Sequence, residues 1–233
     1  TVIGGDEFVI IAGPCSVESR EQVLATAREQ HGKALQLIHI DHGLQDASRS
    51  WAEFCQASAA AMGVDFVCER VVVERDAGDG PEAAARVARY AALAQHVSTT
   101  DWLLSGHHCD DQAETLLLNL LRGSGPAGLR AMPTLRKLGE GYLLRPLLDV
   151  CKDDLLAYAT SAGLEWIEDP SNADDAFDRN FLRAKVLPAF VERWPHAAAK
   201  LARSAELTAE SAELLEELAD IDIAGAGGDA SRL

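Results

Sequence analysis

The sequence lacks any apolar run long enough to cross a bilayer, and its first residues, TVIGGDEF, lack the basic segment that opens a signal peptide. We therefore expect a cytoplasmic protein with no membrane partner. No Cys-x-x-Cys pair occurs either, because the five cysteines are scattered as Cys15, Cys55, Cys68, Cys109 and Cys151. This spacing argues against a disulfide framework and a zinc site, and it fits a reducing compartment.

An excess of basic residues is also lacking. The 233 residues include 21 Lys and Arg against 37 Asp and Glu, a net charge of −16. Such a charge normally counts against a nucleic-acid partner. The segment 200–222 is strongly acidic, however, and six basic residues fall together in the middle of the chain: Arg122, Arg130, Arg136, Lys137, Arg145 and Lys152. A local basic face on an acidic body therefore stays open.

The first half of the chain alternates between strand-like and helix-like segments. Continuous apolar runs predict buried strands at 8–12, 35–40, 65–73 and 101–105, and amphipathic patterns predict helices at 19–30, 48–62 and from Pro81 onwards. Short connections between them favour an α/β fold, a parallel sheet with helices on both faces. Ligands of such sheets bind at the carboxyl ends of the strands.

The second half is predicted to be mostly helical. After a short apolar segment at 142–148, helices are expected at 152–162, 178–186 and 194–220. The last ten residues, AGAGGDASRL, are typical of a linker or a frayed end. The acidic segment 200–222 is interpreted as a solvated helix, or alternatively as an interdomain or homodimer face.

Residues 105–132, SGHHCDDQAETLLLNLLRGSGPAGLRAM, carry more chemistry than any other stretch. Asp110 or Asp111 is expected to cap a helix with Glu114 on its first turn, so that the carboxylates share one face. These carboxylates with two histidines at a strand end could hold a divalent metal or a metal–polyphosphate complex. The alternative is a capping box with acidic first-turn residues. The glycine-rich exit RGSGPAG favours the functional interpretation.

From about residue 34 to 220 the chain resembles the N-terminal domain of tRNA(Ile)-lysidine synthetase. That domain has an N-type ATP-pyrophosphatase fold, like the adenine nucleotide alpha hydrolases. The resemblance rests on HIDHGL at 39–44, GHHCDDQAETLLLNLLRGSGPAGLRAM at 106–132, LLRPLL at 143–148, WIEDPSN at 166–172 and DRNFLR at 178–183.

The resemblance implies a ligase that uses ATP and Mg²⁺ to join lysine to the wobble cytidine in the anticodon of an isoleucine tRNA. It implies catalytic roles for His107, Asp110, Asp111 and Glu114, the last three also as magnesium ligands. It assigns ATP contacts to Asp41, His42 and Arg183, and substrate contacts to Arg122, Arg130, Arg145 and Arg179. For any single arginine, the alternative is solvated surface charge.

The pyrophosphate loop of that family, Ser-Gly-Gly-x-Asp-Ser, is missing. Its place after the first strand is taken by Pro14-Cys15-Ser16-Val17-Glu18-Ser19, in which only the final serine survives. Such a loop binds phosphate through convergent backbone N–H groups, and proline has none to give. A degenerate ATP loop is therefore predicted, made by Gly13, Ser16, Glu18 and Ser19, with ATP turnover impaired or absent.

The N-terminal segment resembles a different family. Residues 3–20, IGGDEFVIIAGPCSVESR, look like the opening of 3-deoxy-arabino-heptulosonate 7-phosphate synthase, in which the cysteine matching Cys15 ligates a metal. The other ligands of that family and its Lys-Pro-Arg motif are absent, so an ordinary half-buried cysteine is favoured. We interpret the chain as a chimera with a join between about Ser19 and Gly32.

This gives a predicted division into residues 1–30, a foreign segment that completes the sheet, 31–190, the ATP-pyrophosphatase-like domain, and 191–233, a C-terminal helical extension. The C-terminal tRNA-binding domains of many family members are expected to be absent. Whether the chain is an enzyme therefore stays open. One alternative is a non-catalytic scaffold that binds tRNA or nucleotide, and a remote one is an aldol-type synthase.

Overall fold

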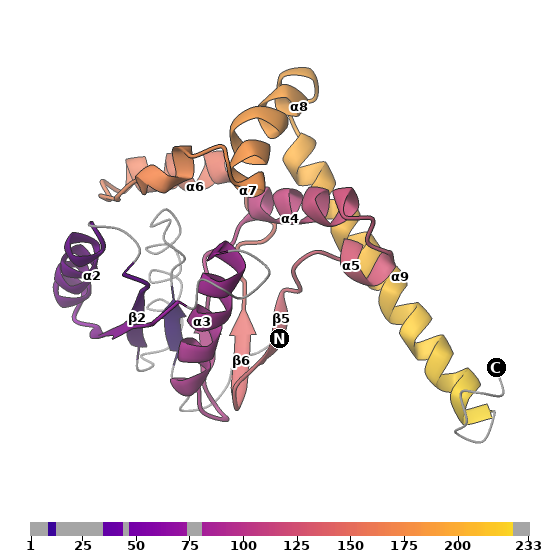
Figure 1. The fold of residues 1–233 in the computed structure, drawn as a ribbon, viewed down its shortest axis with the longest axis horizontal. Coiled ribbons are helices and arrows are strands. Elements are labelled where there is room, and N and C mark those ends of the chain that lie inside the picture. Colours follow the sequence, from indigo (N-terminus) through magenta and orange to yellow (C-terminus); the bar gives the residue numbers. More distant parts are fainter. Residues whose placement is uncertain (1–8, 13–34, 44–46, 74–80, 226–233) are drawn as a thin grey trace. The chain divides into compact units, whose positions relative to one another are not determined.

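The computed structural model of the chain describes residues 9–12, 35–43, 47–73 and 81–225 (Figure 1). They form two compact units. The sheet unit comprises the described residues up to His107 together with 134–147 and 153–169, and the helical unit comprises 108–133, 148–152 and those from Pro170 onwards. The domain boundaries predicted near residues 30 and 190 rest on resemblance and stay predictions.

The sheet unit is built on one six-stranded sheet in the order β3-β2-β1-β4-β6-β5. β1 pairs in parallel with both β2 and β4, β2 with β3, and β4 with β6, whereas β5 runs antiparallel to β6 at the edge. The strands are β1 (Val9–Ala12), β2 (Leu35–Asp41), β3 (Asp65–Arg70), β4 (Trp102–Leu104), β5 (Leu135–Leu138) and β6 (Gly141–Leu144). The predicted parallel α/β sheet is confirmed.

Helices cover both faces of this sheet, as predicted. Side chains alternate along a strand, so neighbouring residues belong to opposite layers. Leu37 and Leu104 pack with Cys55 and Ala59 of α2 (Ser48–Met62). The helix α3 (Pro81–Gln95) covers the other face of the sheet. Its Ala92 and Leu93 pack with four strand residues, Ile38, Ile40, Leu103 and Leu143.

The β5–β6 hairpin was not predicted, because only an apolar segment at 142–148 was expected there. Its turn depends on two glycines. Gly139 has φ 54°, a conformation that is strained for other residues. A Cβ on Gly141 would lie 2.4 Å from the carbonyl oxygen of Asp101, so the backbone approaches β4 too closely for a side chain.

The helical unit contains the stretch that carries most of the candidate chemistry. Its main helices are α4 (Cys109–Leu121) and α9 (Ala197–Gly225), which pack together with the short α5 (Pro126–Leu129) along α9 (Figure 1). Shorter elements precede α9 in the chain, namely η2 (Pro170–Ala173), α7 (Asp178–Phe181), the π turn η3 (Leu182–Val186) and α8 (Leu187–Arg193). The helix α6 (Lys152–Ser161) belongs to the sheet unit from residue 153 onwards.

The core of the helical unit joins α4 to the α7–α8 region and to α9. Cys109, Ala113 and Leu117 come from one face of α4 and pack on Leu182 and Leu187. Ala198 of α9 completes this cluster. Across the described residues, no helix is both long and apolar enough to span a membrane.

Several element boundaries differ from the predictions. β3 ends at Arg70 and not at residue 73, and the helix predicted at 178–186 is divided into α7 and the π turn η3. The N-cap of α4 is His108, not Asp110 or Asp111, because the helix already starts at Cys109. Asp111 instead occupies the third helical position, where its carboxylate accepts the His108 backbone N–H at 3.1 Å. The last helix continues to Gly225 instead of ending at Asp220. The predicted helix at 19–30 lies outside the described residues.

Candidate functional site

The strand order creates a topological switch point around β1. β1 lies between β2 and β4, and all three run parallel, so their carboxyl ends meet at one edge of the sheet. Crevices at such points are where open α/β sheets bind ligands. Asp41 and His42 lie at the end of β2, and Ser105 to His107 follow β4. The predicted loop residues Gly13, Ser16, Glu18 and Ser19 lie outside the described residues.

The end of β2 carries a neutral histidine. Burial and the positive charge of Arg89 lower the pKa of His42 to about 4. Consistent with a neutral ring, Nε2 of His42 accepts a hydrogen bond from Nε of Arg89 at 3.1 Å. Nδ1 then carries the proton, and it is buried without a hydrogen-bond partner among the described residues. A ligand acceptor would satisfy it.

Asp41 shapes the turn after β2. Its Oδ1 accepts the backbone N–H of Gly43 at 2.8 Å. Gly43 has φ 59°, and a Cβ there would lie 3.1 Å from Nη2 of Arg70. The turn is thus closed around the Asp41 carboxylate, which leaves this side chain oriented by its own backbone.

The end of β4 carries a buried polar pair. Ser105 and His107 are 4% and 8% exposed, and the Ser105 hydroxyl hydrogen-bonds Nδ1 of His107. The backbone N–H of Ser105 donates to the Leu144 carbonyl at 3.0 Å, which continues the pairing with β6. His107 is therefore held in one orientation, as a positioned acid–base group requires.

Three arginines surround one tyrosine elsewhere in the sheet unit. The guanidiniums of Arg86 and Arg136 lie 5.2 and 4.6 Å from the ring centre of Tyr90. Arg145, which is 2% exposed, hydrogen-bonds the phenol. Burial alone would raise the pKa of Tyr90, but the three positive charges lower it. Burial and the neighbouring Arg136 and Arg86 also lower the pKa of Arg145.

The start of α4, in the helical unit, is acidic. Asp110 accepts the backbone N–H of Lys152 at 2.9 Å, and Nδ1 of His108 lies 3.6 Å from the same oxygen. Burial opposes ionisation, but His108 and the Lys152 N–H lower the pKa of Asp110 overall. Conversely, burial opposes protonation of His108, yet the carboxylates of Asp110 and Asp111 raise its pKa.

Glu114 is fully buried and is held by two arginines. Its Oε2 accepts Nε of Arg179 at 2.9 Å, and its Oε1 accepts Nε of Arg183 at 2.7 Å. Nη2 of Arg183 also lies 3.3 Å from Oδ1 of Asp111. The two arginines predicted to contact nucleotide or substrate thus contact carboxylates of α4. The partners are 65 to 72 residues apart, and only the i, i+4 spacing of the arginines hinted at a shared target.

The other predicted arginines are placed separately. Arg122 is exposed at the C-cap of α4. Arg130 is partly exposed, with Nη1 3.3 Å from a carboxylate oxygen of Glu216 on α9. Arg145 belongs to the sheet unit, where it contacts Tyr90. The structure therefore divides the predicted substrate residues between the two units.

The three predicted magnesium ligands do not fit the ion equally. Magnesium is usually held by one or two carboxylates together with waters and substrate phosphates. Both oxygens of Glu114 are bonded to arginines, which compensate its charge. Asp110 is partly exposed, accepts one backbone N–H and lies 3.6 Å from Nδ1 of His108. Asp111 already accepts the His108 N–H and lies 3.3 Å from Nη2 of Arg183, so Asp110 fits the ion best.

Comparisons with known proteins give a consistent result. The PP-loop domain matches residues 14–190. The chain is 52% identical over 201 residues to the "tRNA(Ile)-lysidine synthase" of Alkalilimnicola ehrlichii and 51% identical over 200 residues to that of Pseudomonas syringae pv. tomato. Each match covers 86% of this chain but 44% of the relative. The chain thus spans less than half the length of these relatives.

Among solved structures, the fold matches the U34-tRNA thiolase NcsA from Methanococcus maripaludis, determined with its [4Fe-4S] cluster. The TM-score is 0.71, and the match covers 87% of this chain and 72% of that one. The sequence identity is 15%, so the likeness concerns the fold alone.

Proposed function

The chain belongs to the PP-loop domain family, and we propose that it carries the ATP-dependent ligase chemistry of a tRNA(Ile)-lysidine synthase, joining lysine to the wobble cytidine of an isoleucine tRNA. The observation that carries this proposal is the strand order β2-β1-β4. It brings the carboxyl ends of β1, β2 and β4 to one edge of the sheet, and Asp41, His42, Ser105 and His107 lie at or follow the ends of β2 and β4. Relatives about 50% identical that are named for this activity support it.

We assign the nucleotide contacts of the sheet unit to the end of β2. His42 offers a buried N–H that meets no acceptor among the described residues, and it stays neutral at physiological pH. A neutral imidazole beside an arginine suits an acceptor atom of ATP, because it donates without adding charge. Asp41 contributes the turn that keeps this histidine in place.

In the helical unit we assign the magnesium–phosphate group to Asp110. When bound, magnesium neutralises phosphate charge and fixes the geometry of phosphate oxygens. Asp110 suits this role because its lowered pKa keeps it ionised. We assign a positioning role to Glu114, which fixes Arg179 and Arg183. The predicted catalytic roles of His107 and Asp111 remain part of the proposal.

The arginines around Tyr90 support an RNA partner despite the net charge of −16. RNA is bound chiefly through its phosphates, for which guanidinium groups are well suited. Arg86 is exposed and Arg136 half-buried, so both can reach a phosphate while they remain close to the ring. Arg145 is buried, and its positive charge acts on the same phenol.

We propose further that the present loop sequence slows ATP turnover. The segment Pro14 to Ser19 has a proline where the family loop begins and lacks both glycines. Fewer backbone N–H groups can then converge on the pyrophosphate, and non-glycine residues adopt positive φ values only at a cost of about 1–2 kcal/mol each.

ATP–pyrophosphate exchange with isoleucine tRNA tests both proposals. Restoring the loop with Pro14→Ser, Cys15→Gly, Ser16→Gly and Glu18→Asp together should raise the exchange rate at least about tenfold, the effect of one good phosphate contact. Val17→Ala in the same segment is the matched control and should not raise it. Exchange by the unaltered chain at the level of an intact lysidine synthase would refute impairment. If neither the unaltered chain nor the restored-loop variant catalyses exchange, the ligase assignment is contradicted.

A non-catalytic RNA-binding scaffold is the second candidate, and the altered loop is the observation that favours it. Filter binding with isoleucine tRNA distinguishes it from an inert chain, since phosphate contacts give affinity that falls steeply with salt. Binding without exchange in the restored variant would support the scaffold. For an aldol-type synthase we find no supporting observation, and the PP-loop match begins at residue 14, inside the segment on which that resemblance rests.

A further inference from the structure

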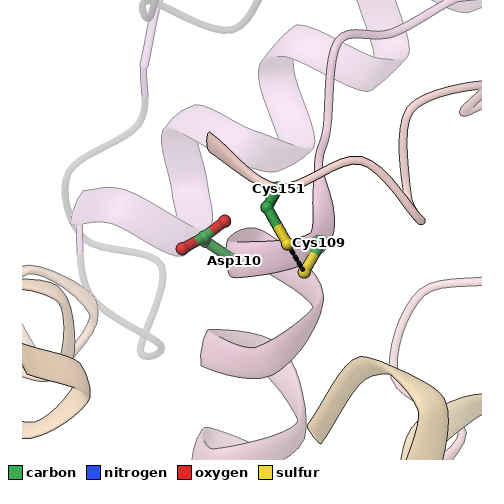
Figure 2. Close-up of side chains that lie close together, drawn as sticks. All are labelled: Cys109, Asp110 and Cys151. Carbon is green, nitrogen blue, oxygen red and sulfur yellow. Dashed lines mark hydrogen bonds between the residues drawn. The ribbon is translucent and has the colours of Figure 1, made fainter. Parts of the chain in front are cut away.

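Two cysteines far apart in sequence meet at the start of α4. Cys109 is the first residue of the helix, and Cys151 lies 42 residues further along, directly before α6. Their sulfurs are 3.2 Å apart, and the cysteines are free thiols. The carboxylate of Asp110 lies beside them, so that one ligand atom from each residue falls within 4.8 Å of the others (Figure 2).

Backbone hydrogen bonds hold these three side chains together. The N–H of Cys109 donates to the carbonyl of Val150 at 2.9 Å. The N–H of Lys152 donates to the Asp110 carboxylate, also at 2.9 Å. The helix start and the 150–152 segment are thus tied on both sides of the cluster. A donor set fixed in this way loses little conformational entropy on taking up an ion.

The donor types select the kind of ion. Two thiolates and a carboxylate suit a thiophilic divalent cation such as Zn²⁺, whereas Mg²⁺ prefers oxygen ligands alone. Zn–S bonds of about 2.3 Å in tetrahedral geometry place two sulfurs about 3.8 Å apart. The observed 3.2 Å therefore needs only a small outward movement of the two side chains.

Cation binding at this cluster is coupled to the protonation of its thiols. Burial, the neighbouring thiol and nearby carboxylates all raise the pKa of Cys109 well above its ordinary value. Deprotonation of Cys109 would place its negative charge beside the carboxylates of Asp110 and Asp149, and a bound cation would compensate that charge. Metal uptake is then coupled to proton release from the cysteines.

A further donor lies next to the cluster. His108 is 5% exposed, and its Nδ1 is buried with no hydrogen-bond partner among the described residues. That nitrogen is 3.6 Å from the Asp110 carboxylate, too far for a hydrogen bond but near enough to approach the same ion. A small ring movement would make it a fourth ligand, and otherwise water fills that position.

We propose that Cys109, Asp110 and Cys151 form a binding site for a thiophilic divalent cation of the Zn²⁺ class. The site shares Asp110 with the proposed magnesium–phosphate group, and in that respect it bears on the proposed function. Its occupancy can be measured without nucleotide or RNA, so the two proposals fail independently.

Titration of the reduced chain with Co²⁺, a spectroscopic substitute for Zn²⁺, tests the proposal. The wild-type chain should show a thiolate-to-cobalt charge-transfer band that saturates at a single equivalent and disappears when Zn²⁺ is added. Cys151→Ser should abolish the band, and Asp110→Asn should weaken binding at least about tenfold through loss of one charged ligand. Cys68→Ser is the matched control, since Cys68 is exposed and outside the cluster, and it should keep the band.

Thermal unfolding gives a second measurement that does not depend on the band. Zn²⁺ should raise the Tm of the wild-type chain and of Cys68→Ser but not that of Cys151→Ser, because only a site formed on folding is stabilised by its ligand. No cobalt band in the reduced wild-type chain would overturn the proposal. A band that survives in Cys151→Ser and in Cys109→Ser would overturn it as well, since it would come from other cysteines.

Discussion

The arginines of the two units are used in contrasting ways. In the sheet unit, Arg86 and Arg136 lie over the ring of Tyr90, and the buried Arg145 acts on the same side chain. In the helical unit, Arg179 and Arg183 are bonded to Glu114. The first group gathers positive charge, whereas the second cancels a buried negative charge. An arginine in a functional motif can thus hold the fold together as readily as it can bind a ligand.

The contrast is sharpest in the expected response to removing one partner. Glu114→Ala removes the buried carboxylate that both guanidinium groups contact. Breaking a buried ion pair lowers the free energy of unfolding by about 3–5 kcal/mol. Urea unfolding would measure this loss. Glu206→Gln is the matched control, because its pair with Arg203 is exposed, and no measurable change is expected. If the Glu114→Ala chain were as stable as wild type, the structural role assigned to Arg179 and Arg183 would be contradicted.

The second prediction concerns the sheet unit and RNA. Arg136→Gln should weaken isoleucine tRNA binding about tenfold and reduce the salt dependence by about one ion, because a single phosphate contact is lost. Filter binding over a range of salt concentrations measures both effects. Arg203→Gln, in the acidic segment of α9, should change neither. If Arg136→Gln binds tRNA like wild type, the arginines around Tyr90 are structural and the contrast disappears.

The third prediction uses the pH dependence of His42. Its pKa falls from an ordinary 6.5 to about 4 in the folded chain, so the unfolded chain takes up a proton first as the pH is lowered. The neutral ring therefore contributes to the free energy of unfolding above about pH 6.5, and this contribution is lost as the pH falls towards 4. Allowing for partial exposure, about 1 kcal/mol should disappear between about pH 7 and pH 5.

Unfolding free energies of the wild-type chain and of His42→Gln at the two pH values measure this difference. His42→Gln should depend less on pH by that amount, because the side chain no longer titrates. Equal pH dependence in both chains would mean that Arg89 and burial do not keep His42 neutral.

The smallest effect is expected at Arg130, whose contact with Glu216 is exposed on both sides. Arg130→Gln should change the free energy of unfolding by less than about 1 kcal/mol. The same variant tests the predicted substrate role, since tRNA affinity can fall without loss of stability. A fall in stability comparable to that of Glu114→Ala would place Arg130 with the structural arginines.

The features that depend on local pattern were predictable from the sequence. The apolar run at 35–40 and the amphipathic stretch at 48–62 correspond to β2 and α2. Burial of a strand or of one helix face requires apolar residues at short, regular spacings, which the sequence displays directly. β5 was missed because Arg136 and Lys137 occupy its centre, and an edge strand tolerates such charges.

Contacts between distant segments were not predictable. Glu114 meets Arg179 65 residues away, and Cys109 meets Cys151 42 residues away. Neither spacing has a local period that marks the pair. The scattered cysteines were taken as evidence against a zinc site, yet the fold brings two of them together with Asp110. Sequence could name the polar residues of the site but not their partners.

The π turn at Leu182–Val186 constrains the number of residues between α7 and α8. A π turn accommodates about one residue more than an α-helical turn. If the segment were a regular α-helix of the same length, residues five apart would lie about 140° from each other around the helix axis. Leu182 and Leu187, which pack in the same core cluster, could then no longer both face α4. Homologues should therefore either keep both the π turn and the spacing of five residues, or lose one residue and the π turn together.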